Sequence, residues 1–218
     1  MDILQLMKER HSVRSFELKS IEDEKKDIIT NYVNNLNNKY HTHHQIFFDD
    51  PDAFKNSSAS YGNFSGCNNY IMLVSTNDKD AGYSGELIAL KLQSLGLNTC
   101  FVGLTYKRGA IKKKVNLNTN EKIRCLLAIG YGINQGKVRK TKTKEQLIEL
   151  KGNTSINTDE LYLACSLAPT AINQQKFKII INGDNIEIIK KGLGPYLDFD
   201  LGIINAHKDL ILKHIELE

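Results

Sequence analysis

The chain has 218 residues, of which 41% are apolar and 25% charged, values typical of an ordinary soluble globular protein. This length can bury one substantial core, so we expect a single domain over residues 1–218. The four cysteines are widely spaced and lack a CxxC pair, which argues against a zinc module and a disulfide framework. No apolar stretch approaches the roughly 20 residues of a membrane helix, so we expect a cytoplasmic protein that does not contact membranes.

The first half of the chain reads as alternating helices and strands. Apolar residues at helical spacing predict a short helix over residues 2–9 and an amphipathic helix over residues 21–40. The apolar run 69–76 predicts a buried strand. A helix is expected over residues 83–95, apolar around most of its surface, with Gly96 as its C-cap and a strand directly after it.

The second half repeats both kinds of element. We expect a buried strand over residues 124–132, then a basic loop and short helix over 136–151. A helix should begin at Asn157 or Thr158 and stop near Pro169. Two strands joined through "GDN" predict a hairpin, and residues 200–216 predict a closing helix. The pattern indicates an α+β sandwich, in which central helices pack on a mixed, mainly antiparallel sheet.

Several stretches could carry chemistry but have simpler explanations. The histidines of "HTHH", residues 41–44, could bind a metal, yet we favour a solvated loop. The basic run 107–114 could contact nucleic acid, but it has few interleaved aromatics, and a solvated helix face is favoured. Residues 61–67 contain two glycines without a dinucleotide or phosphate-loop spacing. Because no catalytic triad can be assembled either, reaction chemistry would have to come from a cofactor.

The segment "KERHSVRSFE", residues 8–17, concentrates cations near the start of the chain. Guanidinium groups bind phosphate through charge-assisted, bidentate hydrogen bonds, and Ser12 adds a hydroxyl donor. Arg10 and Arg14 are four residues apart, so on a helical turn they would share a face and converge on one anion. The alternative is a solvated surface pair beside Glu9 and Glu17.

Four motifs together resemble the FMN-dependent nitroreductase family. "ERHSVRSF" is similar to its R-x-S-x-R-x-F signature, and residues 85–103 are similar to its helix and "LGLGTCW-x-G" segment. "LLAIGYG" resembles the strand that follows, and "APTAINQQKF", residues 168–177, resembles "APSxxNxQPW". The last motif usually comes before the helix, and its position in the C-terminal third resembles a smaller nitroreductase subgroup. Lys176-Phe177 replaces the family's Pro-Trp, and Phe101 replaces the Trp after Cys.

The resemblance implies a nitroreductase-like sandwich that binds FMN and passes hydride from NAD(P)H to a nitroaromatic, quinone or similar flat acceptor. It also implies a homodimer with flavin at the interface, and the apolar helix 83–95 is the kind of element that such a dimer buries. A flavin-binding or sensing protein without turnover stays open, as does a basic nucleic-acid-associated module. Arg139 and Lys140 could complete the phosphate site. The implied cofactor contacts are Arg10 and Ser12 at the phosphate and ribityl end, Arg14 near the pyrimidine ring, the backbone of Val102, Gly103 and Leu104 near N5, and the amides of Asn173 and Gln175.

Overall fold

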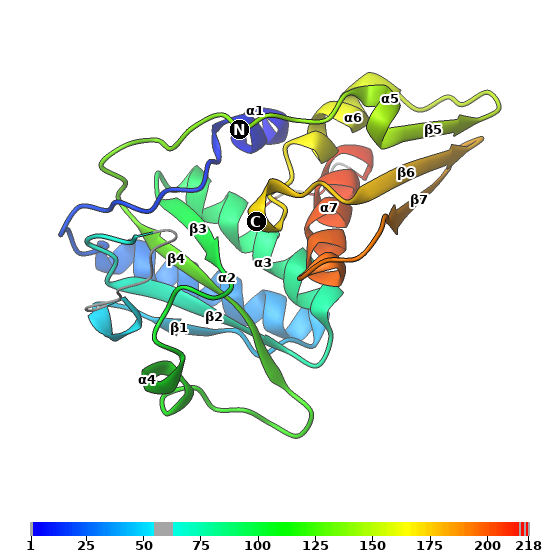
Figure 1. The fold of residues 1–218 in the computed structure, drawn as a ribbon. Helices are drawn as coiled ribbons and strands as arrows, with labels where there is room; N and C mark the ends of the chain where they lie inside the picture. The colour runs from blue at the N-terminus through cyan, green and yellow to red at the C-terminus, as the bar shows by residue number, and fades with distance from the viewer. Residues whose placement is uncertain (1, 55–62, 214, 216, 218) are drawn as a thin grey trace. The chain divides into compact units, whose positions relative to one another are not determined.

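The computed structural model describes residues 2–54, 63–213, 215 and 217. Contacts divide the chain into two compact units. Unit 1 comprises Met1–Lys8, Asp78–Leu87 and Arg139–Glu218, and unit 2 comprises Glu9–Asn77 and Ile88–Val138. Helix α3 (Asp78–Ser94) therefore contributes its first residues to unit 1 and its remainder to unit 2 (Figure 1). The single domain expected over the whole chain stays a prediction.

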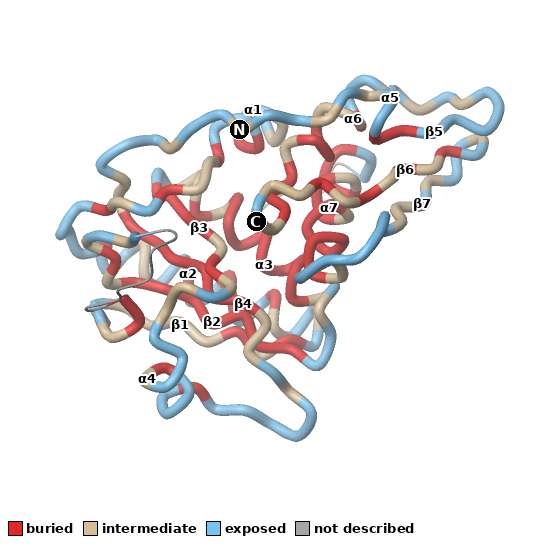
Figure 2. The backbone as a smooth tube through the Cα atoms, in the orientation of Figure 1, coloured by how far each residue is buried: buried red, intermediate tan, exposed pale blue. Residues whose placement is uncertain are grey.

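Unit 2 is built on a four-stranded antiparallel sheet with strand order β1-β2-β4-β3. Its two central strands are largely buried, as Figure 2 shows, because apolar residues occupy both faces. Alternate side chains such as Tyr70, Met72 and Leu126 enter one hydrophobic cluster with Cys100 and Val102. The strands are β1 (Gln45–Phe47), β2 (Asn69–Ser75), β3 (Asn98–Val102) and β4 (Lys122–Gly130).

Two further helices belong to unit 2. Helix α2 (Asp23–Tyr40) has acidic residues in its first turn, where they complement the helix dipole, and it buries Ile29, Val33 and Leu36. Helix α4 (Arg108–Lys112) buries only Ile111, so the basic run around it is a mostly solvated face, as expected. It lies against the short 3₁₀ turn η1 (Pro51–Ala53).

The opening cationic segment is extended, so the expected helical turn is wrong. Helix α1 (Ile3–Glu9) ends at the second residue of the segment, and Ser12 then pairs with Thr99 of β3 in parallel. The Val13 N–H donates to the Thr99 carbonyl at 3.0 Å, and the Phe16 N–H donates to the Ser65 carbonyl at 2.8 Å. Val13 and Phe16 are buried in the cluster described above. The segment therefore covers the otherwise open edge of β3, and this pairing outweighs its helical charge spacing.

Unit 1 combines helices with a three-stranded sheet of order β5-β6-β7, in which β5 runs parallel to β6, and β7 antiparallel. Helix α7 packs against α6 and β7. The expected hairpin is confirmed, with Asn182 opposite Asn185 and Gly183 at a φ of 59° in the turn. The other elements are α5 (Lys144–Leu147), β5 (Ile148–Lys151), α6 (Thr158–Ser166), η2 (Ala171–Asn173), β6 (Phe177–Asn182), β7 (Asn185–Lys190) and α7 (Leu197–Leu212).

The first part of α3 and helix α7 touch through their backbones inside unit 1. A Cβ atom added at Gly82 would lie 2.0 Å from the Phe199 carbonyl oxygen, and one added at Gly202 would lie 2.1 Å from the Lys79 carbonyl oxygen. Glycine on each helix therefore allows the other helix to approach, and no larger residue fits without moving a backbone. The sequence prediction began this helix near Tyr83 and so missed the turn that contains Gly82.

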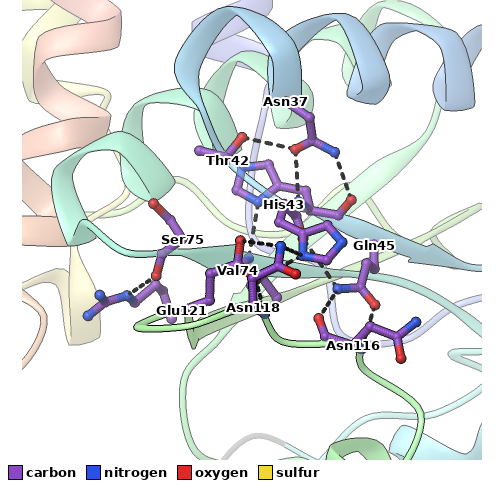
Figure 3. A network of polar contacts seen from close by, with 11 residues as sticks. Asn37, Thr42, His43, Gln45, Val74, Ser75, Asn116, Asn118 and Glu121 are labelled. Carbon is purple, nitrogen blue, oxygen red and sulfur yellow. Dashed lines mark hydrogen bonds and ion pairs between the residues drawn. The ribbon is translucent and has the colours of Figure 1, made fainter.

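The histidine tract forms an ordered polar network within unit 2, rather than the solvated loop we expected (Figure 3). His44 is buried, and its ring accepts the Val74 N–H at 3.1 Å. The Asn37 side chain binds the backbone N–H and carbonyl of His44 at 2.8 and 2.9 Å. His43 lies 2.9 Å from Glu121. The tract thus links the end of α2 to the sheet, because the polar groups that these elements bury are satisfied by one another.

The α+β class and the mainly antiparallel pairing are confirmed, although the strands form two sheets. The helix expected after Asn157 is α6, and the Asn157 side chain caps it by accepting the Glu160 N–H. Strand β5 was not foreseen, because residues 148–151 were assigned to the end of a short helix; they are exposed beyond Ile148. Pairing with β6 makes this segment a strand.

The α3–α7 contact predicts a large effect of a small substitution. Gly82→Ala should destabilise the protein by about 3 kcal/mol, which lowers Tm by about 10 °C in a chain of this size. Gly109→Ala is the matched control, because Gly109 is also helical and a Cβ there meets nothing within 4 Å. The control should be neutral or stabilising, because alanine favours helix. Equal Tm values for both variants would show that the backbones can separate freely.

A second prediction concerns the acid sensitivity that burial of His44 produces. Desolvation lowers the pKa of His44 to about 3, so the folded chain binds fewer protons here than the unfolded chain below about pH 6.5. Stability contributed at this position is therefore lost as pH falls, by about 2 kcal/mol between pH 7 and pH 5. His44→Asn keeps an acceptor for Val74 and should remove that loss in urea unfolding at the two pH values.

His41→Asn is the control, because His41 is exposed at the C-cap of α2 with a φ of 51°, a conformation that asparagine accepts. This variant should lose stability on acidification as the wild type does. An identical acid response in His44→Asn and wild type would contradict the assignment of the effect to His44.

Candidate functional site

The cationic segment gathers around a buried thiol in unit 2. Arg10 is 3% exposed, whereas Arg14 is exposed and Ser12 is half-buried. Burial raises the pKa of the Cys100 thiol, while the charge of Arg14, a hydrogen bond from Ser12 and the charge of Arg10 oppose that increase. All three predicted side chains therefore act on the same thiol, and the structure brings them together. The result is a positively charged region with a hydroxyl group at the N-terminal end of β3.

The predicted backbone contacts follow the other end of β3. Val102 is buried as its last residue, and the chain then turns out, so that Leu104 is 68% exposed. The Gly103 carbonyl accepts a hydrogen bond from Arg108 at 2.7 Å. This bond fixes the orientation of the Gly103 carbonyl group. The segment therefore leaves the sheet in a defined conformation rather than as a loose loop.

Asn173 and Gln175 lie together in unit 1, on a loop with unusual backbone geometry. Ile172, Asn173 and Gln175 have φ values of 47°, 54° and 44°, in the left-handed region that non-glycine residues rarely occupy. Such conformations persist only where the surroundings hold them. Residues 170–175, which we call the amide loop, thus form a strained element at the predicted flavin contacts.

One set of bonds ties the amide loop to the basic segment before α5. The Lys140 carbonyl accepts hydrogen bonds from the Asn173 and Gln175 side chains, each at 2.9 Å. The Lys142 N–H donates to Gln175 Oε1 at 2.8 Å, and Gln175 Nε2 also donates to Asn173 Oδ1. Gln175 is buried, and both N–H groups of its amide are used in these bonds. Gln175 therefore holds the loop against the preceding segment through internal hydrogen bonds.

A second set of bonds holds the loop from α7. The Asp200 carboxylate accepts the Ala171 N–H at 2.9 Å and the Gln174 amide at 2.8 Å. The Gln174 amide also donates to the Pro195 carbonyl. Burial raises the pKa of Asp200 to about 6, and the bonds from Gln174 and Ala171 oppose the increase. Sequence reasoning missed Asp200, although an acid among the apolar residues of a closing helix is an available signal.

The two basic residues suggested for a phosphate site have different surroundings. Arg139 donates to the Leu167 carbonyl at the end of α6, so its guanidinium group caps that helix. Lys140 is exposed, and its backbone carbonyl orients the two amides. Their role in anion binding stays a prediction.

A fully buried acid–histidine pair was also missed. Glu86 and His207 are both 0% exposed, and Glu86 Oε1 lies 2.8 Å from His207 Nε2. His207 Nδ1 lies 2.7 Å from the Ala164 carbonyl, which can only accept, so this nitrogen carries a hydrogen. The pair thus contains one shared proton, on either the imidazole or the carboxyl. It links α3, α6 and α7 within unit 1.

The described residues hold no cluster of three or more potential metal ligands from His, Cys, Asp and Glu. In the same part of the chain, no helix combines the length and the apolar character that crossing a bilayer requires. Of the glycine-containing stretch 61–67, residues 61 and 62 lie outside the described residues. Gly66 is described, and a Cβ there would lie 2.0 Å from the Phe16 carbonyl oxygen, so this glycine serves close packing.

The chain is similar to known proteins over most of its length. The sequence model of the family described as "Putative TM nitroreductase" matches residues 2–211. A solved "putative nitroreductase" from Thermotoga maritima MSB8 is 20% identical with a TM-score of 0.64, over 98% of this chain and 85% of that chain. A nitroreductase family protein from Streptococcus pneumoniae TIGR4 is 12% identical with a TM-score of 0.55, over 68% and 99%.

A third structure, from Bacteroides thetaiotaomicron VPI-5482, is described as "Putative NADH dehydrogenase/NAD(P)H nitroreductase". It is 17% identical with a TM-score of 0.52, over 66% of this chain and 95% of that chain. No curated protein matches the sequence. At these identities the solved structures show the nitroreductase fold, and the family match extends over nearly the whole sequence. The chain therefore belongs to the family described as "Putative TM nitroreductase".

Proposed function

We propose that the protein is an FMN-dependent oxidoreductase that uses NAD(P)H to reduce a nitroaromatic, quinone or similar flat acceptor. Family membership and the nitroreductase fold support an oxidoreductase. The description of the Bacteroides thetaiotaomicron protein names NAD(P)H as that protein's donor, which makes the same donor a reasonable choice here. The single observation that carries the proposal is the pairing of Ser12 with Thr99, which holds the segment that contains Arg10, Ser12 and Arg14 against β3.

The chemistry of that cluster fits the phosphate end of FMN. A flavin phosphate is close to doubly ionised near neutral pH, and arginine binds it with planar, paired N–H donors. Arg14 is exposed, so its guanidinium group can reach a ligand. Ser12 contributes a hydroxyl from the strand-like segment between the arginines, and the pairing with Thr99 fixes its position. Arg10 is buried, so it would contribute its positive charge to the phosphate site from inside the protein.

The remaining predicted contacts offer groups suited to a polar ring edge. Asn173 keeps one amide N–H and one acceptor lone pair beyond the bonds described above. Gln175 would act by holding Asn173 in place, since its own amide hydrogens are used. Val102, Gly103 and Leu104 would offer backbone N–H groups, with Arg108 holding the Gly103 peptide. The position of the amide motif in the C-terminal third supports the subgroup named by resemblance above.

When bound, FMN would supply the two-electron chemistry, taking hydride from NAD(P)H and passing electrons to the acceptor. The task left to the protein is to bind, orient and partly enclose the cofactor. No acid or base among these residues is needed for that role. The arginine cluster would fix the phosphate end, and the amide loop would fix the orientation of the ring.

We also propose a homodimer and a single functional domain over residues 1–218. The apolar helix α3 does not itself supply a dimer interface, because most of its apolar side chains are already buried within one chain. A dimer would therefore use other surfaces, among them exposed apolar residues such as Leu104 and Leu193.

Flavin binding provides the first test of this proposal. Purified protein should be yellow, with an absorbance maximum at about 450 nm that arises from the cofactor itself. Arg14→Ala should weaken FMN binding by about 10- to 100-fold, because one charge-assisted pair to phosphate is lost. Lys113→Ala, which removes an exposed cation at the C-cap of α4, is the control and should bind as the wild type does. A colourless protein that does not take up added FMN would refute the proposal.

Turnover separates the enzyme from a protein that only binds flavin. With FMN bound, we expect NADH or NADPH to bleach the flavin absorbance under argon, and addition of a nitroaromatic or quinone to restore it. Steady consumption of NAD(P)H that depends on the acceptor would confirm an oxidoreductase. Flavin that binds but stays oxidised with both nucleotides would instead favour a binding or sensing role.

A further inference from the structure

The amide loop requires an anchor that can hold an unfavourable backbone. Three of its six residues have positive φ values without being glycine, a conformation that is energetically unfavourable for such residues. If the backbone of the amide loop relaxed to more favourable φ values, Asn173 would move away from its present position. The bonds to the Lys140 carbonyl hold one side of the loop, and Asp200 holds the other.

Asp200 is an unusual choice of anchor, since it is 4% exposed and its two partners, Ala171 N–H and the Gln174 amide, are neutral. A buried carboxylate without a cation pays for desolvation, and replacing such a charge with a neutral isostere is often harmless to stability. A buried carboxylate that destabilises the fold and lies beside a strained loop is more typical of a functional site than of a hydrophobic core.

Charged groups on the elements around Asp200 are engaged elsewhere. On its own helix, Asp198 binds Lys190 of β7 at 3.0 Å. After the amide loop, Lys176 donates to the Leu193 carbonyl at 2.6 Å. Burial and the two neutral donors therefore govern the ionisation of Asp200, in agreement with its raised pKa.

We propose that Asp200 is a positioning residue, whose ionised carboxylate holds the amide loop in the shape that presents Asn173 to a flavin. The inference rests on the proposed function for the identity of the ligand. That Asp200 holds the amide loop is inferred from its own hydrogen bonds and does not depend on the ligand. Charged acceptors form stronger hydrogen bonds than neutral ones. Protonation of Asp200, or its replacement by a neutral side chain of the same shape, therefore weakens the hydrogen bonds that hold the amide loop.

The test is Asp200→Asn, which preserves the size of the side chain and one acceptor for the Ala171 N–H. At pH 7.5 its dissociation constant for FMN should be about 10-fold above that of the wild type, because a charged acceptor becomes neutral. Its Tm should stay close to that of the wild type, because removal of a buried charge offsets loss of the hydrogen bond from the Gln174 amide. Asp198→Asn, on the same helix, is the control and should bind FMN within about twofold of the wild type, since it loses only a surface ion pair.

A pH series distinguishes positioning by charge from a general packing effect. The FMN phosphate titrates near pH 6 in both proteins, so the ratio of the two dissociation constants is compared at each pH. That ratio should fall from about 10 at pH 7.5 towards about 1 at pH 5, where wild-type Asp200 is protonated as well. A ratio near 1 at pH 7.5, or one that does not change with pH, would overturn the inference.

Hydrogen exchange of the flavin-free protein keeps this result separate from the proposed function. At pH 7.5 the Ala171 amide should exchange about 10-fold faster in Asp200→Asn than in the wild type, because its acceptor is weaker. Faster exchange in a protein that fails to bind FMN would refute the flavin proposal but support the inference that Asp200 holds the amide loop. Unchanged exchange would refute the positioning role whether or not FMN binds.

Discussion

The open edge of β3 is the constraint on which the predicted cofactor contacts of unit 2 depend. An edge strand leaves backbone groups that must find partners, and Ser12 and Val13 supply them by pairing with Thr99. Further along the same segment, Phe16 bonds to the Ser65 carbonyl. This pairing buries Val13 and Phe16 in the cluster under the sheet. The pairing also fixes the positions of Arg10, Ser12 and Arg14, because a paired backbone limits the directions in which its side chains can point. A cationic cluster is thereby assembled without any helix.

Unit 1 obtains its contacts in a different way. The amide loop adopts a backbone that its own residues disfavour, and hydrogen bonds from both sides hold it. Gln175 satisfies its amide entirely inside the protein, whereas Asn173 keeps capacity for a ligand. Rigid positioning of a few polar groups is what a flavin protein needs, because the cofactor carries the reaction chemistry. Strain in the loop and the buried charge at Asp200 are thus parts of one arrangement.

Close helix contact and a buried polar pair act together in unit 1. Gly82 and Gly202 bring α3 and α7 together at backbone distance, and the Glu86–His207 pair lies on the same two helices. A buried pair that shares one proton is satisfied only while its geometry is kept, so it contributes specificity to the helix arrangement. In unit 2, the network around Asn37 and His44 similarly joins α2 to β1 and β2 (Figure 3).

The sequence by itself determined the elements whose signals are local. Apolar periodicity located α2, β2, β4 and α7, the Asn157 cap marked the start of α6, and the "GDN" turn predicted the hairpin. Motif similarity, not periodicity, pointed to the family. The choice of Arg10, Ser12, Arg14, Asn173 and Gln175 as cofactor contacts came from the same similarity, and their binding role stays a proposal.

Tertiary structure decided what depends on partners distant in the chain. Helical charge spacing predicted a turn for residues 10–14, but the unpaired edge of β3 made the segment extended, since backbone hydrogen bonds outweigh weak surface ion pairs. Polar composition predicted a solvated histidine tract, but Asn37 and Val74 provided partners that allow His44 to be buried. The roles of Asp200 and Gln175 likewise appear only in three dimensions, because each is defined by the strained loop that it holds and not by its neighbours in the sequence.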